Sequence, residues 1–203
     1  MIPFVTANHI AAMSDLGVAG AAIFAAWQGV KSLKVWREEK LGIRRMELAE
    51  EALVQFYQIA HAFGSIRSPM GDAAEHAERE PEDFETETQR HWRNVAFTTW
   101  ERLKTHNEEF QNFYKTGLKL RAVFGAEIYE SCEDLRKCYG RVRVASRMLF
   151  QIPPNGYNDA DFHQRLEQDI WDMDREDEGS IESWVKLSVL NAERILGAVL
   201  RDH

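Results

Sequence analysis

The hydrophobic pattern of the chain starts with one long apolar run, from Ile10 to Val30, which a group of basic residues follows directly. As an α-helix, these 21 residues would extend over roughly 32 Å, close to the bilayer hydrocarbon thickness of about 30 Å. The pattern therefore predicts a transmembrane helix with a basic exit over residues 10–36, after a short outer segment over residues 1–9.

Asp15 leaves the register of this helix open, because a charge near the centre of a bilayer costs about 3 kcal/mol. In one register the span begins at Ile10 and includes Asp15. In the other, Ser14 or Asp15 caps the helix at the outer interface, and the span runs from Leu16 to about Val35. The residues expected to form the span or to anchor it at the inner interface are Asp15, Leu16, Gly17, Ala21, Ala25, Trp27, Lys31, Lys34, Trp36 and Arg37.

The distribution of positive charge predicts the orientation of the span. No Lys or Arg precedes the apolar run, whereas six lie between Lys31 and Arg45. Because such charges stay on the cytoplasmic side, we expect the N-terminus outside and the C-terminal domain inside the cell. Small residues fall near one helix face, a pattern that lets two membrane helices approach and form a homo-oligomer: Ser14, Gly17, Ala21 and Ala25.

Beyond residue 36, apolar residues recur every three or four positions, and no stretch alternates as a strand does. The predicted helices extend from the span to about 64, from about 86 to 124 with a break near 105–107, from about 128 to 149, and over about 160–173 and 181–201. Acidic loops are predicted at about 65–84 and about 174–180. The predicted fold is therefore all-α: one N-terminal transmembrane helix that continues into an antiparallel bundle of about four main helices over residues 37–203.

Two other interpretations of the apolar run compete with a membrane span. A secretory signal peptide carries its positive charge before the apolar run, whereas here the charge follows it. An Ala-rich helix with one Asp is also typical of the core of a soluble bundle. The abrupt change from apolar to basic residues at Lys31 favours the membrane span, because a core helix more often shows a polar face along its whole length.

Composition and charge narrow the possible functions. The chain has 203 residues, 44% of them hydrophobic, which leaves room for one domain besides the span. Its net charge of -8 argues against nucleic-acid binding, because phosphate contacts require a basic face. Cys132 and Cys138 lie six positions apart on one predicted helix and point to different faces, so we expect no disulfide and a reducing compartment.

The sequence contains no catalytic or cofactor-binding signature. It has no glycine-rich phosphate loop, no dinucleotide-binding motif and no nucleophile elbow of the hydrolases. The stretch from Asp174 to Glu182 imitates the first part of a calcium loop, but Val185 stands where the closing glutamate belongs. No cofactor and no metal are therefore predicted.

Three arginines form one polar cluster that could hold a ligand, and the carboxylates near His163 form another. Arg136, Arg143 and Arg147 share one face of the helix predicted over 128–149, where they could bind an anion. Ion pairs with acidic residues of a neighbouring helix are the alternative for the same three side chains.

The N-terminal third resembles a group of small bacterial single-span membrane proteins that have a cytoplasmic helical domain. The resemblance rests on Ile23-Phe-Ala-Ala-Trp27-Gln with its basic exit, and on Glu50-Glu51-Ala-Leu-Val-Gln-Phe-Tyr in a long helix. It implies a location in the bacterial inner (cytoplasmic) membrane. It implies no activity and no functional residue.

These observations favour a non-enzymatic, membrane-anchored helical protein that presents a cytoplasmic bundle for partner binding or self-assembly. Its expected partners are the lipid bilayer, a second copy of the chain and an unidentified protein, but not nucleic acid. The alternative is a ligand-binding or enzymatic helical bundle, soluble or tethered, with a polar cleft between helices.

Overall fold

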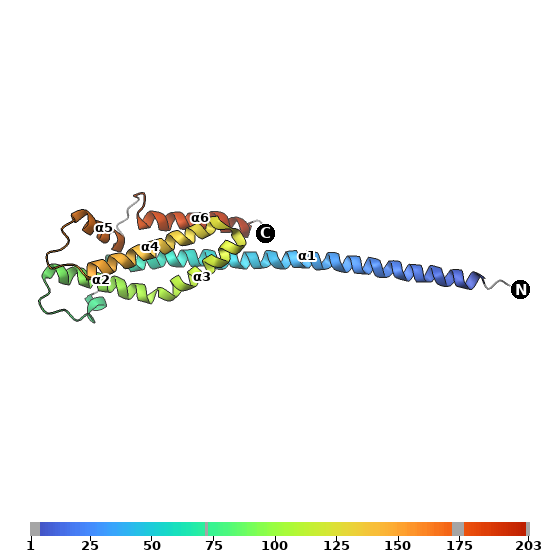
Figure 1. Ribbon diagram of the computed structural model, residues 1–203, viewed down its shortest axis with the longest axis horizontal. Helices are drawn as coiled ribbons and strands as arrows, with labels where there is room; N and C mark the ends of the chain where they lie inside the picture. The colour runs from blue at the N-terminus through green and yellow to red at the C-terminus, as the bar shows by residue number, and fades with distance from the viewer. Residues whose placement is uncertain (1–4, 72, 172–176, 202–203) are drawn as a thin grey trace. The chain divides into compact units, whose positions relative to one another are not determined.

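The computed structural model describes the backbone of residues 5–71, 73–171 and 177–201 (Figure 1). Side chains are described for the same residues except 5–23, 25, 26, 73 and 76. In this part of the chain the secondary structure is helical and contains no strand. The elements are α1 (Val5–Ile66), the 3₁₀ turn η1 (Ala73–His76), α2 (Glu87–Thr105), α3 (Asn107–Phe124), α4 (Ala126–Phe150), α5 (Ala160–Ile170) and α6 (Ile181–Arg201).

The chain divides into two compact units, Met1–Met46 and Glu47–His203, which we describe separately. In the second unit, the last part of α1, the α2–α3 pair, α4 and α6 run antiparallel to one another in turn (Figure 1). Helix α4 packs against α2, α3, α5 and α6. The prediction of an all-α bundle is confirmed.

The main core of the bundle is built from aromatic pairs between α1 and α3. The ring of Phe56 meets that of Phe113 edge to face with centroids 5.0 Å apart, and Phe63 meets Phe110 in the same way at 5.3 Å. All four side chains are buried. Edge-to-face pairs add about 1 kcal/mol each beyond the burial of their apolar area, so they fix how these two helices pack.

A second, smaller core lies where α5 covers α2 and α4. Its buried side chains are Trp92, Ala96, Ala145, Leu149, Ile152, Leu166 and Ile170. The ring of Trp92 contacts the rings of His163 on α5 and of Trp171, with centroids 4.9 Å and 5.2 Å away. Helix α5 is too short to be stable alone, so this contact holds it in place.

The two cysteines pack into the main core as free thiols. Burial raises the pKa of both Cys132 and Cys138 to about 12, so neither is a thiolate nucleophile at neutral pH. A Cβ placed on Gly117 of α3 would lie 3.3 Å from the Cβ of Cys132, which is tight. Glycine at this position therefore lets α3 and α4 approach closely.

The helix breaks occur where the sequence predicts them. The predicted break near 105–107 falls at His106, between α2 and α3. The capping box of Thr86 and Gln89 fixes the start of α2, because each side chain accepts from the other residue's backbone N–H. Gly125 separates α3 from α4 with φ 94° and ψ -168°, a conformation that is essentially restricted to glycine.

Replacing Gly125 by Ala is expected to lower the free energy of unfolding by about 2 kcal/mol, because the added Cβ strains this backbone conformation. Gly140→Ala is the matched control. Gly140 lies inside α4, where a Cβ would meet nothing within 4 Å, so alanine is expected to stabilise the helix by up to about 1 kcal/mol. Urea titration of both variants measures the difference, and effects of equal sign would contradict the assignment.

The first unit contains the N-terminal part of α1, which carries large apolar side chains in solvent. Among the described side chains these are Phe24, Trp27, Val30, Leu33, Val35, Trp36, Leu41 and Ile43. Where side chains are described, no helix has a stretch that is both long and apolar enough to cross a membrane. Most of the predicted span, including Asp15, lies outside the residues with described side chains, so the transmembrane part of the fold prediction is without structural support.

Candidate functional site

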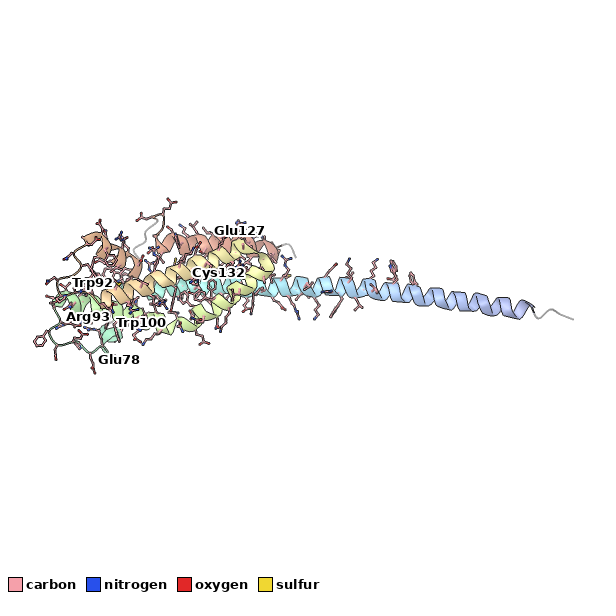
Figure 2. All side chains as sticks on the ribbon, viewed as in Figure 1. Glu78, Trp92, Arg93, Trp100, Glu127 and Cys132 are labelled. Carbon is pink, nitrogen blue, oxygen red and sulfur yellow. The ribbon has the colours of Figure 1, made fainter. Side chains whose placement is uncertain are left out.

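An open groove lies between α2 and α4 in the second unit. It has a volume of about 490 Å³, within the range of roughly 300–1,000 Å³ that small-molecule sites occupy. Its lining residues are Ala96, Phe97, Trp100 and Glu101 on α2, and Ser146, Arg147, Phe150 and Gln151 at the end of α4. Trp100 is on the second half of α2, where its side chain is 42% exposed (Figure 2).

Small residues at the helix contact create this groove. The Ser146 hydroxyl donates a hydrogen bond to the backbone carbonyl of Ala96 at 2.8 Å, and both residues are buried. The hydroxyl is therefore satisfied within the protein. Ala96 and Ser146 are buried, whereas Trp100 and Phe150 are partly exposed, so small residues form the floor of the groove and aromatic side chains its walls.

Among the charged side chains that line the groove, one cation is available to bind a ligand. The Glu101 carboxylate lies 2.6 Å from the ammonium group of Lys104, so its charge is largely compensated. Arg147 is exposed, and its guanidinium makes no hydrogen bond or ion pair within the described part of the chain. The local field therefore favours an anion beside Arg147.

The three arginines singled out in the sequence have different surroundings. Arg136 pairs with Glu133 of the same helix at 2.7 Å, and both side chains are accessible to solvent. Arg143 is exposed on α4. Of the three, Arg147 lines the groove, so the structure does not bring all three into one pocket. Anion binding by this face stays a prediction.

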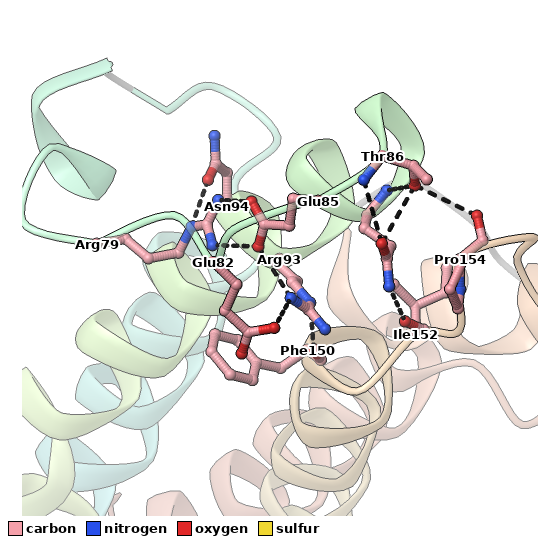
Figure 3. A network of polar contacts seen from close by, with 10 residues as sticks. Arg79, Glu82, Glu85, Thr86, Arg93, Asn94, Phe150, Ile152 and Pro154 are labelled. Atoms are coloured by element: carbon pink, nitrogen blue, oxygen red, sulfur yellow. Dashed lines mark hydrogen bonds and ion pairs between the residues drawn. The ribbon is translucent and has the colours of Figure 1, made fainter.

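A buried ion network fastens the loop before α2 (Figure 3). The Glu85 carboxylate, 1% exposed, lies 2.7 Å from Arg79 and 3.0 Å from Arg93. Arg79 also donates to Asn94 at 2.6 Å, and Arg93 donates to the carbonyl of Phe150 at 3.1 Å. The Arg79 guanidinium, assisted by Arg93, lowers the pKa of Glu85 to about 2 although burial acts in the opposite direction. Such a carboxylate is too weak a base for acid–base catalysis at neutral pH.

Two other arginines also bind parts of the chain itself. Arg102 donates to the carbonyls of Ser65, Ser68 and Met70 and forms an ion pair of 2.6 Å with Glu75. Arg102 borders a polar hollow of about 300 Å³ that also contains Thr98 and Thr99. Because these backbone contacts already use the donors of Arg102, this hollow offers less charge to a ligand than the groove does.

Arg67, just after α1, is buried at 2% exposure. It donates to the carbonyls of Gln168, Asp169 and Trp171, where α5 ends, and it pairs with Glu182 at 2.7 Å. These contacts satisfy the carbonyls that a helix leaves open at its C-terminus. We assign Arg67 a structural role.

Phe84 is the feature of the bundle surface that the sequence pattern misses. Its side chain is fully exposed, and its backbone φ is 69°, which is unusual for a bulky residue. Its neighbour Glu85 is held in the buried ion network, so the strained conformation is fixed from one side. No periodicity marks this residue, because it lies in a loop.

No potential metal site is found in the part of the chain that the structure describes: no group of three or more His, Cys, Asp or Glu residues is close enough to hold an ion. The calcium-like stretch from Asp174 lies partly outside that range, since residues 172–176 are not described. His163 pairs with Glu167 one turn later at 3.0 Å, as an ordinary i,i+4 helix pair.

Comparison with known proteins does not assign the chain to a family, since no protein-family model, no curated protein and no solved structure matches it. The resemblance to bacterial single-span membrane proteins therefore stays a hypothesis.

Proposed function

We propose that the chain is a membrane-anchored helical protein, without an enzymatic activity of its own, that presents its C-terminal bundle to a partner. The observation that carries this proposal is the apolar surface of α1 before its basic residues. Phe24, Trp27 and Val30 are each more than half exposed. With its residues placed about 100° apart, the sequence from Ile10 to Val30 leaves no continuous polar face on the helix, and Asp15 is its one charge. A helix that is apolar on all sides requires an apolar environment, and a bilayer supplies one.

The aromatic and basic residues at the end of this stretch support an inner membrane interface there. The ammonium group of Lys31 lies over the ring of Trp27 at 5.6 Å, and that of Lys40 lies over Trp36 at 5.7 Å. Tryptophan and lysine are both favoured at the level of lipid headgroups. In this proposal the protein is in the bacterial inner membrane, with the N-terminus outside and the bundle in the cytoplasm.

The bundle surface supports a role in partner binding. Phe84 is fully exposed, with a backbone φ of 69°, and aromatic residues are enriched in protein interfaces. Self-association through Gly17, Ala21 and Ala25 is a second route to assembly within the same proposal.

Cell fractionation tests the proposal. The untagged chain is expected in the membrane fraction, resistant to alkaline carbonate and released by detergent. Val18→Arg with Ile23→Arg should move the chain to the soluble fraction, because each charge near the bilayer centre costs about 3 kcal/mol. Leu41→Arg, beyond the basic exit, is the control and should stay with the membrane. Recovery of the wild-type chain in the soluble fraction without detergent would contradict the proposal that α1 anchors it in a membrane.

A further inference from the structure

The groove between α2 and α4 takes no part in the anchoring or partner binding proposed above. We propose that it binds a small amphiphile with an apolar body and one anionic group, such as a carboxylate or sulfonate, which Arg147 holds by its guanidinium. The ligand is a free small molecule, whose apolar body lies on the groove floor.

The groove surface calls for an apolar ligand body. Phe97, Trp100 and Phe150 provide aromatic side chains around it, and Trp100 and Phe150 keep 42% and 40% of their surface exposed. At the floor, the Ser146 hydroxyl is already bonded to the Ala96 carbonyl, so it does not compete for a polar ligand group. A flat or extended apolar group would cover the exposed aromatic surface and remove it from water.

The charges call for an anionic group at one end of the ligand. Arg147 lines the groove with its guanidinium unengaged within the described residues, while Glu101 is compensated by Lys104 at 2.6 Å. A planar guanidinium can bind a carboxylate or sulfonate through two parallel N–H···O bonds. The complementarity is therefore directional: the apolar body points toward Trp100 and the anion toward Arg147.

Two fluorescent probes of the same shape separate the two parts of the proposal. Dansyl sulfonate, that is 5-(dimethylamino)naphthalene-1-sulfonate, carries the anion. Dansylamide, the corresponding sulfonamide, is its neutral counterpart. Both are titrated into the full chain, in plain buffer or in phosphatidylcholine nanodiscs according to the fractionation result, with signal from empty discs subtracted. Energy transfer from tryptophan to the dansyl group reports binding. We expect saturable 1:1 binding of dansyl sulfonate, about tenfold tighter than that of dansylamide.

Three variants complete the test. Arg147→Gln should weaken dansyl sulfonate about tenfold and leave dansylamide unchanged. Arg143→Gln, an exposed arginine one turn away on the same helix, should change neither affinity. Trp100→Ala should weaken both probes alike, measured by direct dansyl fluorescence. Equal affinity of the wild type for the two probes, an equal loss in Arg143→Gln, or no saturable binding would overturn the proposal.

Discussion

Replacing Arg67 by Met is expected to lower the free energy of unfolding by about 3 kcal/mol or more, because three backbone carbonyls lose a buried donor and an unsatisfied buried group costs about 1–3 kcal/mol. The Arg67 side chain is 2% exposed, and Glu182 is 19% exposed. Methionine fills a similar volume but leaves Glu182 without this partner and removes the donors to the carbonyls of Gln168, Asp169 and Trp171. The end of α5 should loosen first.

Urea titration of the full chain in mild detergent, followed by tryptophan fluorescence, measures the loss. Arg165→Met is the control, because Arg165 is an exposed arginine on α5, and substitutions of this kind stay within about 0.5 kcal/mol. Arg67→Lys should recover only part of the loss, since one ammonium group cannot reproduce the spread of guanidinium donors. A cost for Arg67→Met no larger than that of the control would show that the buried pair does not stabilise the fold.

Glu85→Gln is expected to cost about 3 kcal/mol at neutral pH and to remove part of the acid sensitivity of the protein. The pKa of Glu85 falls from 4.5 to about 2 in the folded chain, and each unit corresponds to about 1.4 kcal/mol. Because the unfolded chain takes up the proton first, the stabilisation is complete above pH 4.5 and is lost as the pH falls toward about 2. The variant has no carboxylate at this position to protonate, so its stability should change less across that range.

Glu82→Gln is the matched control for this prediction. Glu82 pairs with the same Arg93 at 2.7 Å, but its side chain is 67% exposed. Exposed pairs contribute roughly 0–1 kcal/mol, so this variant should keep both the stability and the acid response of the wild type. Urea titrations at several pH values between 2 and 7 compare the three chains. An unchanged acid response in Glu85→Gln would place the titrating group elsewhere.

The sequence predicts the helices of the bundle well, because helices leave local signals. Apolar spacing predicts the last helix over 181–201, and the structure has α6 at Ile181–Arg201. Gly125 ends a helix, as a glycine at this position predicts, and it adopts a φ of 94°. Both features depend on neighbours within a few residues, so one sequence is enough to find them.

The contacts of the loops could not be predicted in the same way. The segment over 65–84 was predicted as a solvated acidic loop, but Arg79 and Arg102 fasten it to α2. Arg67 reaches carbonyls about 100 positions later in the chain. Such pairings follow from how the helices pack and have no fixed spacing, so periodicity does not reveal them.

The candidate site, too, could be predicted from the sequence only in its local part. The sequence places Arg147 on one face of a helix with Arg136 and Arg143, and it predicts that an anion could bind there. It does not predict that Arg147 alone of these borders an aromatic groove, because the opposite wall comes from α2. The two walls meet where two small residues, Ser146 and Ala96, are in contact through a hydrogen bond.

The hydrogen bond from Arg93 to the Phe150 carbonyl connects the buried ion network with the groove. Arg93 belongs to the ion network of Glu85, and Phe150 forms a wall of the groove. Protonation of Glu85 would weaken its ion pair with Arg93 and so loosen one of the contacts that hold the end of α4. By thermodynamic linkage, a ligand that orders Phe150 would in turn make Glu85 harder to protonate. Occupancy of the groove and resistance to acid would then rise together.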